Sequence, residues 1–213
     1  MNQKKTRISE PNLGDLIPFN GLQLEEEGKY LEYLFSDITF AESVIKNARY
    51  GDSKFVKVDF SGSHMHKSYI SDCIVDDSNL ANAVWNESVV KVVVFENCRL
   101  TGFQLNEATL EDVIFRDCKI DYGQFQYIQC NRVQFERCNL TNAYFQGADL
   151  RGVVFKDCEM SEVDLSQTRL KDADFRGSKI SAMRVDPAHV RGAIFDTSQI
   201  YYLVSLLGVS ILE

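Results

Sequence analysis

Residues 138–157 read CNLTN AYFQG ADLRG VVFKD, four successive blocks of five in which the third residue is always large and apolar. The same register runs through most of the chain, because every residue from Tyr30 to Ile200 whose number is a multiple of five is apolar, 35 positions without an exception. A step of five advances about 140° around an α-helix and alternates faces on a flat strand, so neither element would bring these side chains together. The register predicts a chain that turns a corner once per five residues and points each central side chain at a common axis, as a solenoid does.

The other positions of each block support this interpretation. The residue two before the central one is mostly small, as in Ala48, Ser63 and Ala143, whereas the remaining three carry nearly all the charge, as in Glu96 and Arg137. We therefore expect two side chains per block to point inward, one large and one small, and the other three to face water.

The residue types repeat every twenty positions. Phe stands at 35, 55, 95, 115, 135, 155, 175 and 195, with Val75 as the only substitution, and accounts there for eight of the chain's 14 phenylalanines. Cys98, Cys118, Cys138 and Cys158 form a second column. Like side chains stack when coils follow one another at the interstrand spacing of about 4.8 Å, so the sequence predicts a four-sided coil of twenty residues and a rod of roughly nine coils, about 40 Å long.

The repeat resembles that of a known family. Blocks such as Ala148–Gly152 (ADLRG) and Ala173–Gly177 (ADFRG) are similar to the pentapeptide-repeat consensus A-[DN]-[LF]-x-x, and the likeness covers roughly residues 30 to 200. It implies an all-β fold, a right-handed quadrilateral parallel β-helix. We accordingly expect an N-terminal segment and cap over 1–29, the pentapeptide-repeat β-helix over 30–200, and a C-terminal capping and dimerisation segment over 201–213 that holds a short α-helix and a strand.

Both ends resemble those of Qnr-type topoisomerase-protecting proteins, in particular the loop-free chromosomal forms of Gram-positive bacteria. The likeness lies in residues 10–13 and 22–25 at one end and in 198–203 and 206–209 at the other, and no insertion interrupts the register between them. It implies a DNA-mimicking binding protein, a homodimer that interacts with DNA gyrase or topoisomerase IV and protects against quinolones. The residues expected to bind the partner are outward and acidic: Asp117, Asp157, Glu159, Glu162, Asp172 and Asp174. An alternative is a pentapeptide-repeat scaffold for protein–protein interaction with another partner.

The charge pattern allows two interpretations. The chain carries 31 acids and 23 bases, a net charge of −8, which argues against direct binding of nucleic acid. In one column acids alternate with bases, whereas Glu32, Asp52 and Asp72 stack without a base between them and acids crowd the last coils. Stacked like charges cost stability, which favours a role in partner binding. An ordinary acidic, soluble surface remains the other interpretation.

An apolar group of outward residues surrounds Trp85. It comprises Val84, Val89, Val92 and Val94, and Ile114 and Val154 continue the column of Val94. Contiguous exposed apolar area often marks a contact surface. We hypothesise that residues 10–24 pack there, or that a partner does.

The sequence offers no catalytic or metal site. Inward side chains fill the coil and leave no interior pocket, so we expect neither enzymatic activity nor a small-molecule substrate. The six cysteines all fall on inward positions without a C-x-x-C pair, which indicates buried free thiols, and the three histidines lack a second ligand at a defined offset. We expect no cofactor and no metal. With neither a secretory signal nor a membrane-spanning stretch in the sequence, we expect a cytoplasmic protein.

The C-terminal segment is predicted to cap the rod and join two copies. Asp196 and Gln199 have the spacing of a capping box, and Ile200, Leu203, Val204 and Leu207 recur as one helix face that would cover the last coil. The residues expected in a twofold dimer are Tyr201, Tyr202, Leu206, Val209 and Ile211, the last two on a terminal strand. A monomer with a folded-back tail is the alternative. Phe103, large where a small residue is usual, predicts a local bulge or a side-chain rearrangement.

Overall fold

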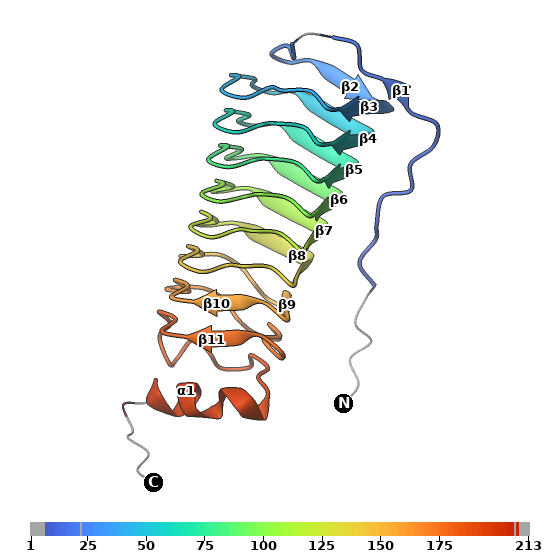
Figure 1. Cartoon of the computed structure of the whole chain (residues 1–213). Coiled ribbons are helices and arrows are strands. Elements are labelled where there is room, and N and C mark those ends of the chain that lie inside the picture. Colours follow the sequence, from blue (N-terminus) through green and yellow to red (C-terminus); the bar gives the residue numbers. More distant parts are fainter. Residues whose placement is uncertain (1–6, 22, 207, 209–213) are drawn as a thin grey trace.

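The computed structural model describes residues 7–21, 23–206 and 208 and shows a four-sided parallel β-solenoid (Figure 1). It makes about eight turns, close to the nine expected from the sequence. Successive coils pair at an offset of twenty residues, so that Phe35 lies opposite Phe55 and Phe115 opposite Phe135. The predicted fold class is confirmed. Within the described residues no helix is long and apolar enough to cross a membrane.

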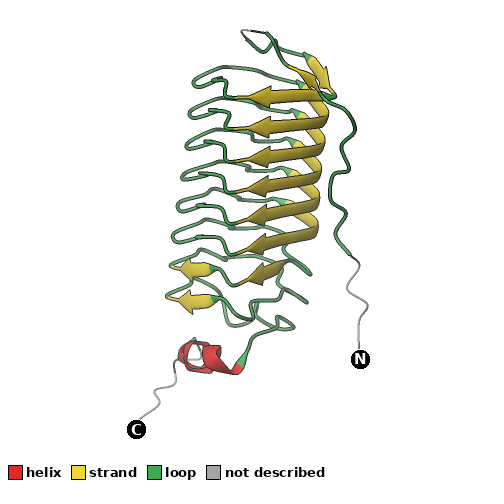
Figure 2. Ribbon diagram, turned by 45° about the vertical axis from the view of Figure 1, so that its right-hand side comes forward, coloured by secondary structure: helices red, strands yellow, loops and turns green. Residues whose placement is uncertain are grey.

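The strands follow the four sides of the coil. We name each side after its central residue in the first coil: the Tyr30 side (28–32), the Phe35 side (33–37), the Phe40 side (38–42) and the Ile45 side (43–47), each repeated every twenty residues. The strands are β1 (Ile17–Pro18), β2 (Lys29–Leu31), β3 (Tyr33–Ser36), β4 (Arg49–Val56), β5 (Tyr69–Asp76), β6 (Val89–Glu96), β7 (Thr109–Arg116), β8 (Gln129–Glu136), β9 (Val154–Lys156), β10 (Glu159–Ser161) and β11 (Lys179–Ser181). Strands β4 to β8 bend around one corner and form the wide sheet of Figure 2, whereas the Ile45 side is joined by isolated bridges.

The corners are built by left-handed residues. From Glu27 to Gly192, the residue two after each central one has a positive φ, with Pro187 as the one exception among the described residues. Asp, Asn and Gly, which tolerate this conformation best, occupy many of these corners. The proline ring fixes φ near −65° and cannot make such a corner, so the regular coil is lost around Pro187.

Stacked aromatic rings fill the interior. Phe115 and Phe135 lie with ring centroids 4.8 Å apart and planes 4° from parallel, and Phe155, Phe175 and Phe195 continue the stack at 5.0 Å. The thiols of the cysteine column are free and buried, and each donates to carbonyl oxygens, as Cys138 Sγ does to Phe115 O at 3.3 Å. These observations confirm the predicted inward positions.

The bulge expected at Phe103 is absent. The bridges from Val84 to Gln104 and from Gln104 to Gln124 keep the register intact on both sides of it. Phe103 is fully buried and packs edge-on against Trp85, with centroids 5.4 Å apart. The Phe95 ring is its other aromatic neighbour, with centroids 6.5 Å apart.

An N-terminal strap, residues 7–16, runs along the rod beside the strands (Figures 1 and 2). It leads into β1, which pairs with β3, and then into Phe19. The Phe19 ring lies 4.6 Å from that of Phe35 and also contacts Tyr30, Tyr33 and Phe40. Phe19 therefore closes the first coil.

The C-terminal cap depends on the side chain of Gln199 more than on an apolar face of the C-terminal helix. The predicted capping box is present at the turn η1 (Thr197–Gln199), and α1 follows at Ile200–Ser205. Gln199 Nε2 donates to Phe175 O at 2.8 Å and to Ser178 O at 2.7 Å, and so replaces the amides of a further coil. The expectation that Ile200 covers the last coil is wrong, because it is 52% exposed. Leu207 and the expected strand lie outside the described residues.

Candidate functional site

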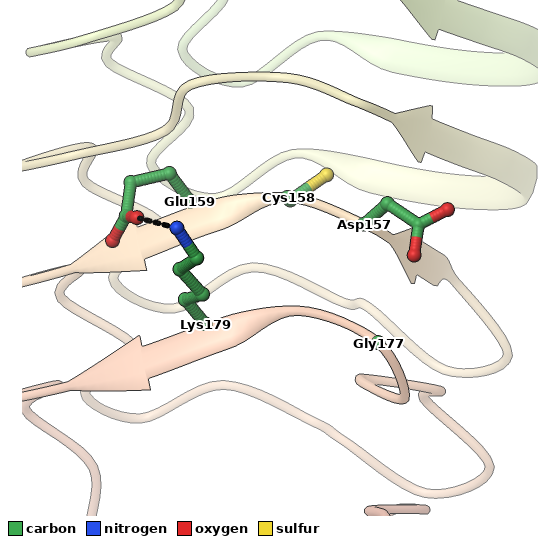
Figure 3. Close-up of a pocket in the computed structure, with 5 residues that line it drawn as sticks. All are labelled: Asp157, Cys158, Glu159, Gly177 and Lys179. Atoms are coloured by element: carbon green, nitrogen blue, oxygen red, sulfur yellow. Dashed lines mark ion pairs between the residues drawn. The ribbon is translucent and has the colours of Figure 1, made fainter.

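The outside of the rod holds two open hollows near its C-terminal end. The first, about 270 Å³, is lined by Asp157, Cys158, Glu159, Gly177 and Lys179 (Figure 3). The second, about 590 Å³, lies between β11 and α1 and includes Glu159, Gln199, Tyr201 and Tyr202. Two predicted partner-binding residues and two predicted dimerisation residues thus line neighbouring hollows. No group of three metal-ligating side chains occurs in the described part of the chain.

Three of the six predicted acids are engaged by bases of the same chain. Arg137 donates from Nε and Nη2 to both carboxylate oxygens of Asp117 at 2.7 Å, which holds the pKa of Asp117 below its ordinary value. Arg176 likewise donates from Nε and Nη2 to the two carboxylate oxygens of Asp174, at 2.9 and 2.8 Å. Asp174 is almost fully buried. Glu159 lies 3.9 Å from Lys179 Nζ (Figure 3). Bases of the same chain neutralise much of the charge of these three carboxylates, which leaves little negative charge to attract a partner.

The other three acids, Asp157, Glu162 and Asp172, have no ion pair within 4.0 Å among the described residues. All three occupy left-handed corners and project outward, with φ of 54°, 59° and 63°. They lie at three different corners of the last coils. Their charge therefore surrounds the C-terminal third of the rod instead of forming one flat face.

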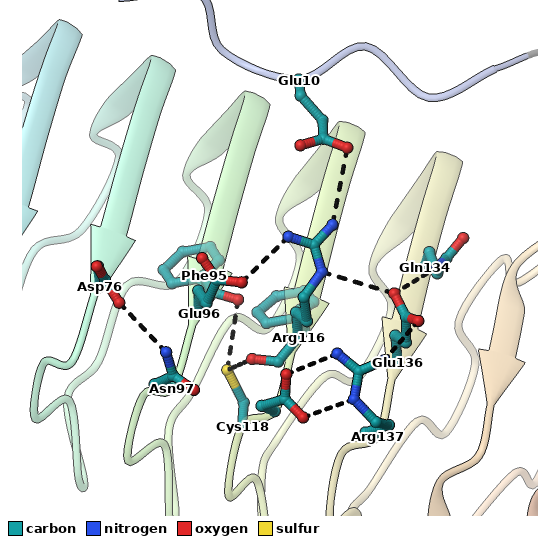
Figure 4. Close-up of polar contacts among 12 residues, drawn as sticks. Glu10, Asp76, Phe95, Glu96, Asn97, Arg116, Cys118, Gln134, Glu136 and Arg137 are labelled. Carbon is teal, nitrogen blue, oxygen red and sulfur yellow. Dashed lines mark hydrogen bonds and ion pairs between the residues drawn. The ribbon is translucent and has the colours of Figure 1, made fainter.

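A charged network on the Phe35 side was not foreseen from the sequence. Arg116 lies among three carboxylates, Glu96 at 3.2 Å, Glu136 at 3.6 Å and Glu10 at 3.7 Å (Figure 4). Lys156 and Arg137 bind Glu136 from the other side at 2.8 and 2.6 Å. The spacing of twenty between Glu96, Arg116 and Glu136 is a signal that could have revealed the rung-to-rung pairs. Nothing in the sequence spacing marks Glu10.

The strap covers part of the predicted apolar group. Val94 and Ile114 occupy outward positions, yet each is only 4% exposed. Ser9 N donates to Asp112 Oδ1 at 3.2 Å and Glu10 reaches Arg116, so the strap passes beside these two side chains. The hypothesis that the N-terminal segment packs there is supported for Val94 and Ile114.

The four valines do not form one patch, which corrects the expectation. Val94 pairs with Ile74 and Ile114 on the Phe35 side, Val89 with Tyr69 and Thr109 on the Tyr30 side, and Val84 with His64 and Gln104 on the Ile45 side. Because the chain turns a corner every five residues, residues close in sequence are separated onto different sides. The contact surface hypothesised around Trp85 is therefore not a single patch.

The predicted dimerisation residues differ in exposure. Tyr201 is 70% exposed, whereas the hydroxyl of Tyr202 donates to Met183 O at 2.6 Å and Tyr202 is half-buried. Leu206 is also half-buried. Val209 and Ile211 lie outside the described residues. Tyr201 is thus the described residue of this set with the most surface to offer a second copy.

Comparison with protein families adds to this geometry. The pentapeptide repeat region matches residues 48–125 and 128–203. The chain belongs to the pentapeptide-repeat family.

Several solved structures are similar to this chain, and one of them, at a TM-score above 0.5, shares its fold. A trypsin-treated variant of QnrB1, described as a plasmid-mediated fluoroquinolone resistance protein, is 16% identical; the match covers 87% of this chain and 100% of that one, with a TM-score of 0.56. Full-length QnrB1 matches over 85% and 100% at 16% identity with a TM-score of 0.43. HetL from the cyanobacterium Nostoc, described as involved in regulating heterocyst differentiation, matches over 82% and 93% at 14% identity and 0.26. No curated relative matches the chain.

As in any pentapeptide-repeat protein of this build, the interior serves the fold. The central side chains along most of the rod are fully buried, and five of the six cysteines are buried, Cys130 being of intermediate exposure. Burial raises the pKa of the Cys73 thiol to about 12, and it raises the pKa of the Cys130 thiol as well. Neither cysteine is therefore a thiolate near neutral pH. Chemistry and recognition are left to outward residues and to the two ends.

Proposed function

We propose that this pentapeptide-repeat protein is a DNA-mimicking binding protein that occupies the DNA-binding surface of gyrase or topoisomerase IV and thereby reduces quinolone action. The proposal rests on the Qnr-like ends of the sequence together with the fold shared with QnrB1, whose description is fluoroquinolone resistance. At 16% identity the likeness to QnrB1 supports the fold and does not by itself carry the activity.

The observation that carries the proposal is the set of unpaired carboxylates at the corners of the last coils, Asp157, Glu162 and Asp172. They project from a rod whose interior is filled, and they lie at three different corners within twenty residues, whereas duplex DNA carries one charge per about 1.7 Å of axis. Three carboxylates within one coil's length cover a much shorter distance than a bound DNA segment does, and a second copy would be needed to extend the array.

A homodimer through the C-terminal end would supply that extension. Two rods joined at α1 would place the acidic corners of both copies near the centre of the assembly. Tyr201 is the described residue best placed to make the contact, because its side chain is mostly exposed beside the hollow next to β11. A twofold contact would use the same residue on both copies.

A supercoiling assay with purified gyrase and ciprofloxacin tests the proposal. Wild-type protein is expected to restore supercoiling, and the triple variant Asp157→Lys/Glu162→Lys/Asp172→Lys to need on the order of tenfold more protein for the same rescue. The matched control is Asp37→Lys/Glu42→Lys/Asp52→Lys, which changes acids in the same three corner rows at the N-terminal end and should act as wild type. If wild type neither rescues nor binds gyrase over a wide concentration range, the topoisomerase proposal is rejected in favour of another protein partner.

A further inference from the structure

The N-terminal strap occupies a surface that is built like a peptide-binding site. Within residues 7–16, the half-buried side chains are Ile8, Pro11, Leu13 and Leu16, and the residues between them are exposed. The segment is extended and lies along a row of outward apolar side chains on the Phe35 side, Ile74, Val94 and Ile114. It is thus bound as an extended peptide with apolar side chains turned to the rod.

Two polar contacts fix the register of the strap on this surface. Ser9 N donates to Asp112 Oδ1, and the Glu10 carboxylate faces Arg116 (Figure 4). Asp112 is itself held by Arg132, whose Nε and Nη2 donate to its two oxygens at 2.7 Å, so the acceptor for Ser9 stays in place without the strap. Arg116 likewise keeps Glu96 and Glu136. The surface is therefore formed without the strap, and the strap binds to it as a peptide ligand would.

The strap is held weakly enough to exchange. Its ion pair spans 3.7 Å with Glu10 more than half exposed, and exposed pairs of this kind contribute about 0–1 kcal/mol. Residues 7–16 form no strand with the rod, because β1 begins only at Ile17. The remaining attachment is the burial of apolar side chains, which another segment of the same chemistry could provide.

We propose that the Phe35 side of β5 to β7 is a binding site for an extended peptide of a partner protein. The peptide has apolar side chains at alternating or third positions and a carboxylate that faces Arg116. Residues 8–16 of the chain itself occupy this site and compete with the partner for it. A partner that carries such a segment displaces the strap, gains the apolar row, and docks beside the charged network. The inference is independent of whether that partner is a topoisomerase.

The test uses full-length protein and a fluorescent peptide of residues 7–17. A variant with a loosened strap, Leu13→Ser/Leu16→Ser/Glu10→Lys, is expected to bind the peptide at least tenfold more tightly than wild type does, since wild type keeps its own strap in place. A peptide with Glu10→Lys should bind the loosened variant several-fold more weakly. Hydrogen exchange at Val94 and Ile114 should rise in the loosened variant and fall again on adding peptide.

A second variant controls for misfolding. Ser9→Cys/Asp112→Cys places thiols where the strap and β7 already touch, and oxidation would lock the strap. The locked form should not bind the peptide, whereas the same protein after reduction should bind it, more weakly than the loosened variant does, because its strap keeps Leu13 and Leu16 and Asp112 is no longer there to accept from Ser9 N. The proposal is overturned if the loosened variant is folded and does not bind the peptide, or if locked and reduced forms bind it equally. Either result leaves the gyrase assay to decide the proposed function separately.

Discussion

At the scale of single residues, the corners restrict which residue types the sequence can use, because of their backbone conformation. Every corner from Glu27 to Gly192 except Pro187 is left-handed, a conformation that costs L-residues roughly 1–2 kcal/mol each. Asn, Asp and Gly tolerate it best, which explains their frequency there. Val92, with φ 53°, is the β-branched residue in this set and is the least suited to its place.

Val92→Asn is therefore expected to stabilise the protein, by about 1 kcal/mol, because the left-handed backbone is retained while the β-branched side chain is removed. The reverse change one coil corner away, Asn97→Val at φ 53°, should destabilise it by a similar amount. Urea unfolding followed by circular dichroism measures both. Equal midpoints for the two variants would contradict this account of the corners.

The row of Glu32, Asp52 and Asp72 makes a pH-dependent prediction. Burial, and next the neighbouring Asp52 carboxylate, raise the pKa of Asp72 above its ordinary value. A carboxyl whose folded pKa is raised binds its proton more tightly when folded, so its ionisation lowers stability once the pH exceeds the folded pKa. Asp72→Asn should then raise the free energy of unfolding at pH 7, by less than about 1 kcal/mol, and the gain should vanish at a pH below the ordinary carboxyl pKa. Denaturant titrations at several pH values measure it; a gain that persists in acid would indicate another cause.

At the scale of elements, the ends matter more than any one coil. A parallel solenoid leaves strand edges unpaired at both ends, and these need covers. Phe19 covers the aromatic stack at one end, and the Gln199 amide satisfies two carbonyls at the other. The short helix α1 contributes no fully buried residue.

Gln199→Ala is expected to destabilise the protein by about 1–3 kcal/mol, because Ser178 O loses the Gln199 amide and Phe175 O keeps only Ser178 N as a donor. Gln167→Ala, at an exposed corner of the rod, is the matched control and should change little. Thermal unfolding of both variants, together with hydrogen exchange in β11, distinguishes fraying of the last coil from global loss of stability. Unchanged exchange in β11 would argue against a capping role.

How far the sequence alone predicts such elements depends on how local they are. The fold, the aromatic column and the cysteine column followed from the register, because each coil repeats the previous one. Pro187 also indicates a break in the coil, because a corner at that position needs a positive φ, which proline cannot adopt. The packing of Phe103 carried no such signal, because it depends on the rings of Trp85 and Phe95 together. The strap contacts were equally hidden, for Ser9 and Asp112 are 103 residues apart.

The candidate site shows the same limit. The six acids were chosen by sign and outward position, and the pair of Asp117 with Arg137 could be anticipated from their spacing of twenty. The bidentate contact of Arg176 with Asp174 depends on side-chain conformation within one block. Only the structure separates these carboxylates from Asp157, Glu162 and Asp172.

At the scale of the whole molecule, the end-to-end arrangement of two copies is the main prediction. Tyr201→Asp should shift the protein from dimer to monomer, because a charge would be placed in an apolar contact of the proposed seam. Tyr122→Asp is the control, since Tyr122 is 53% exposed on the side of the rod. Sedimentation at micromolar concentration gives the masses. A wild-type mass near 24.3 kDa would reject the dimer and favour a monomer with a folded-back tail.

The offset of twenty residues between neighbouring coils has a consequence for how such a chain can change in length. If residues 129–148 were removed, Ile128 would be joined to Asp149, and every inward column and every corner would keep its partner above and below. The rod would shorten by one rung of about 4.8 Å while both caps stayed unaltered. Length in this architecture is graded in whole steps, so the distance between its two ends can be adjusted to a partner without redesigning either end.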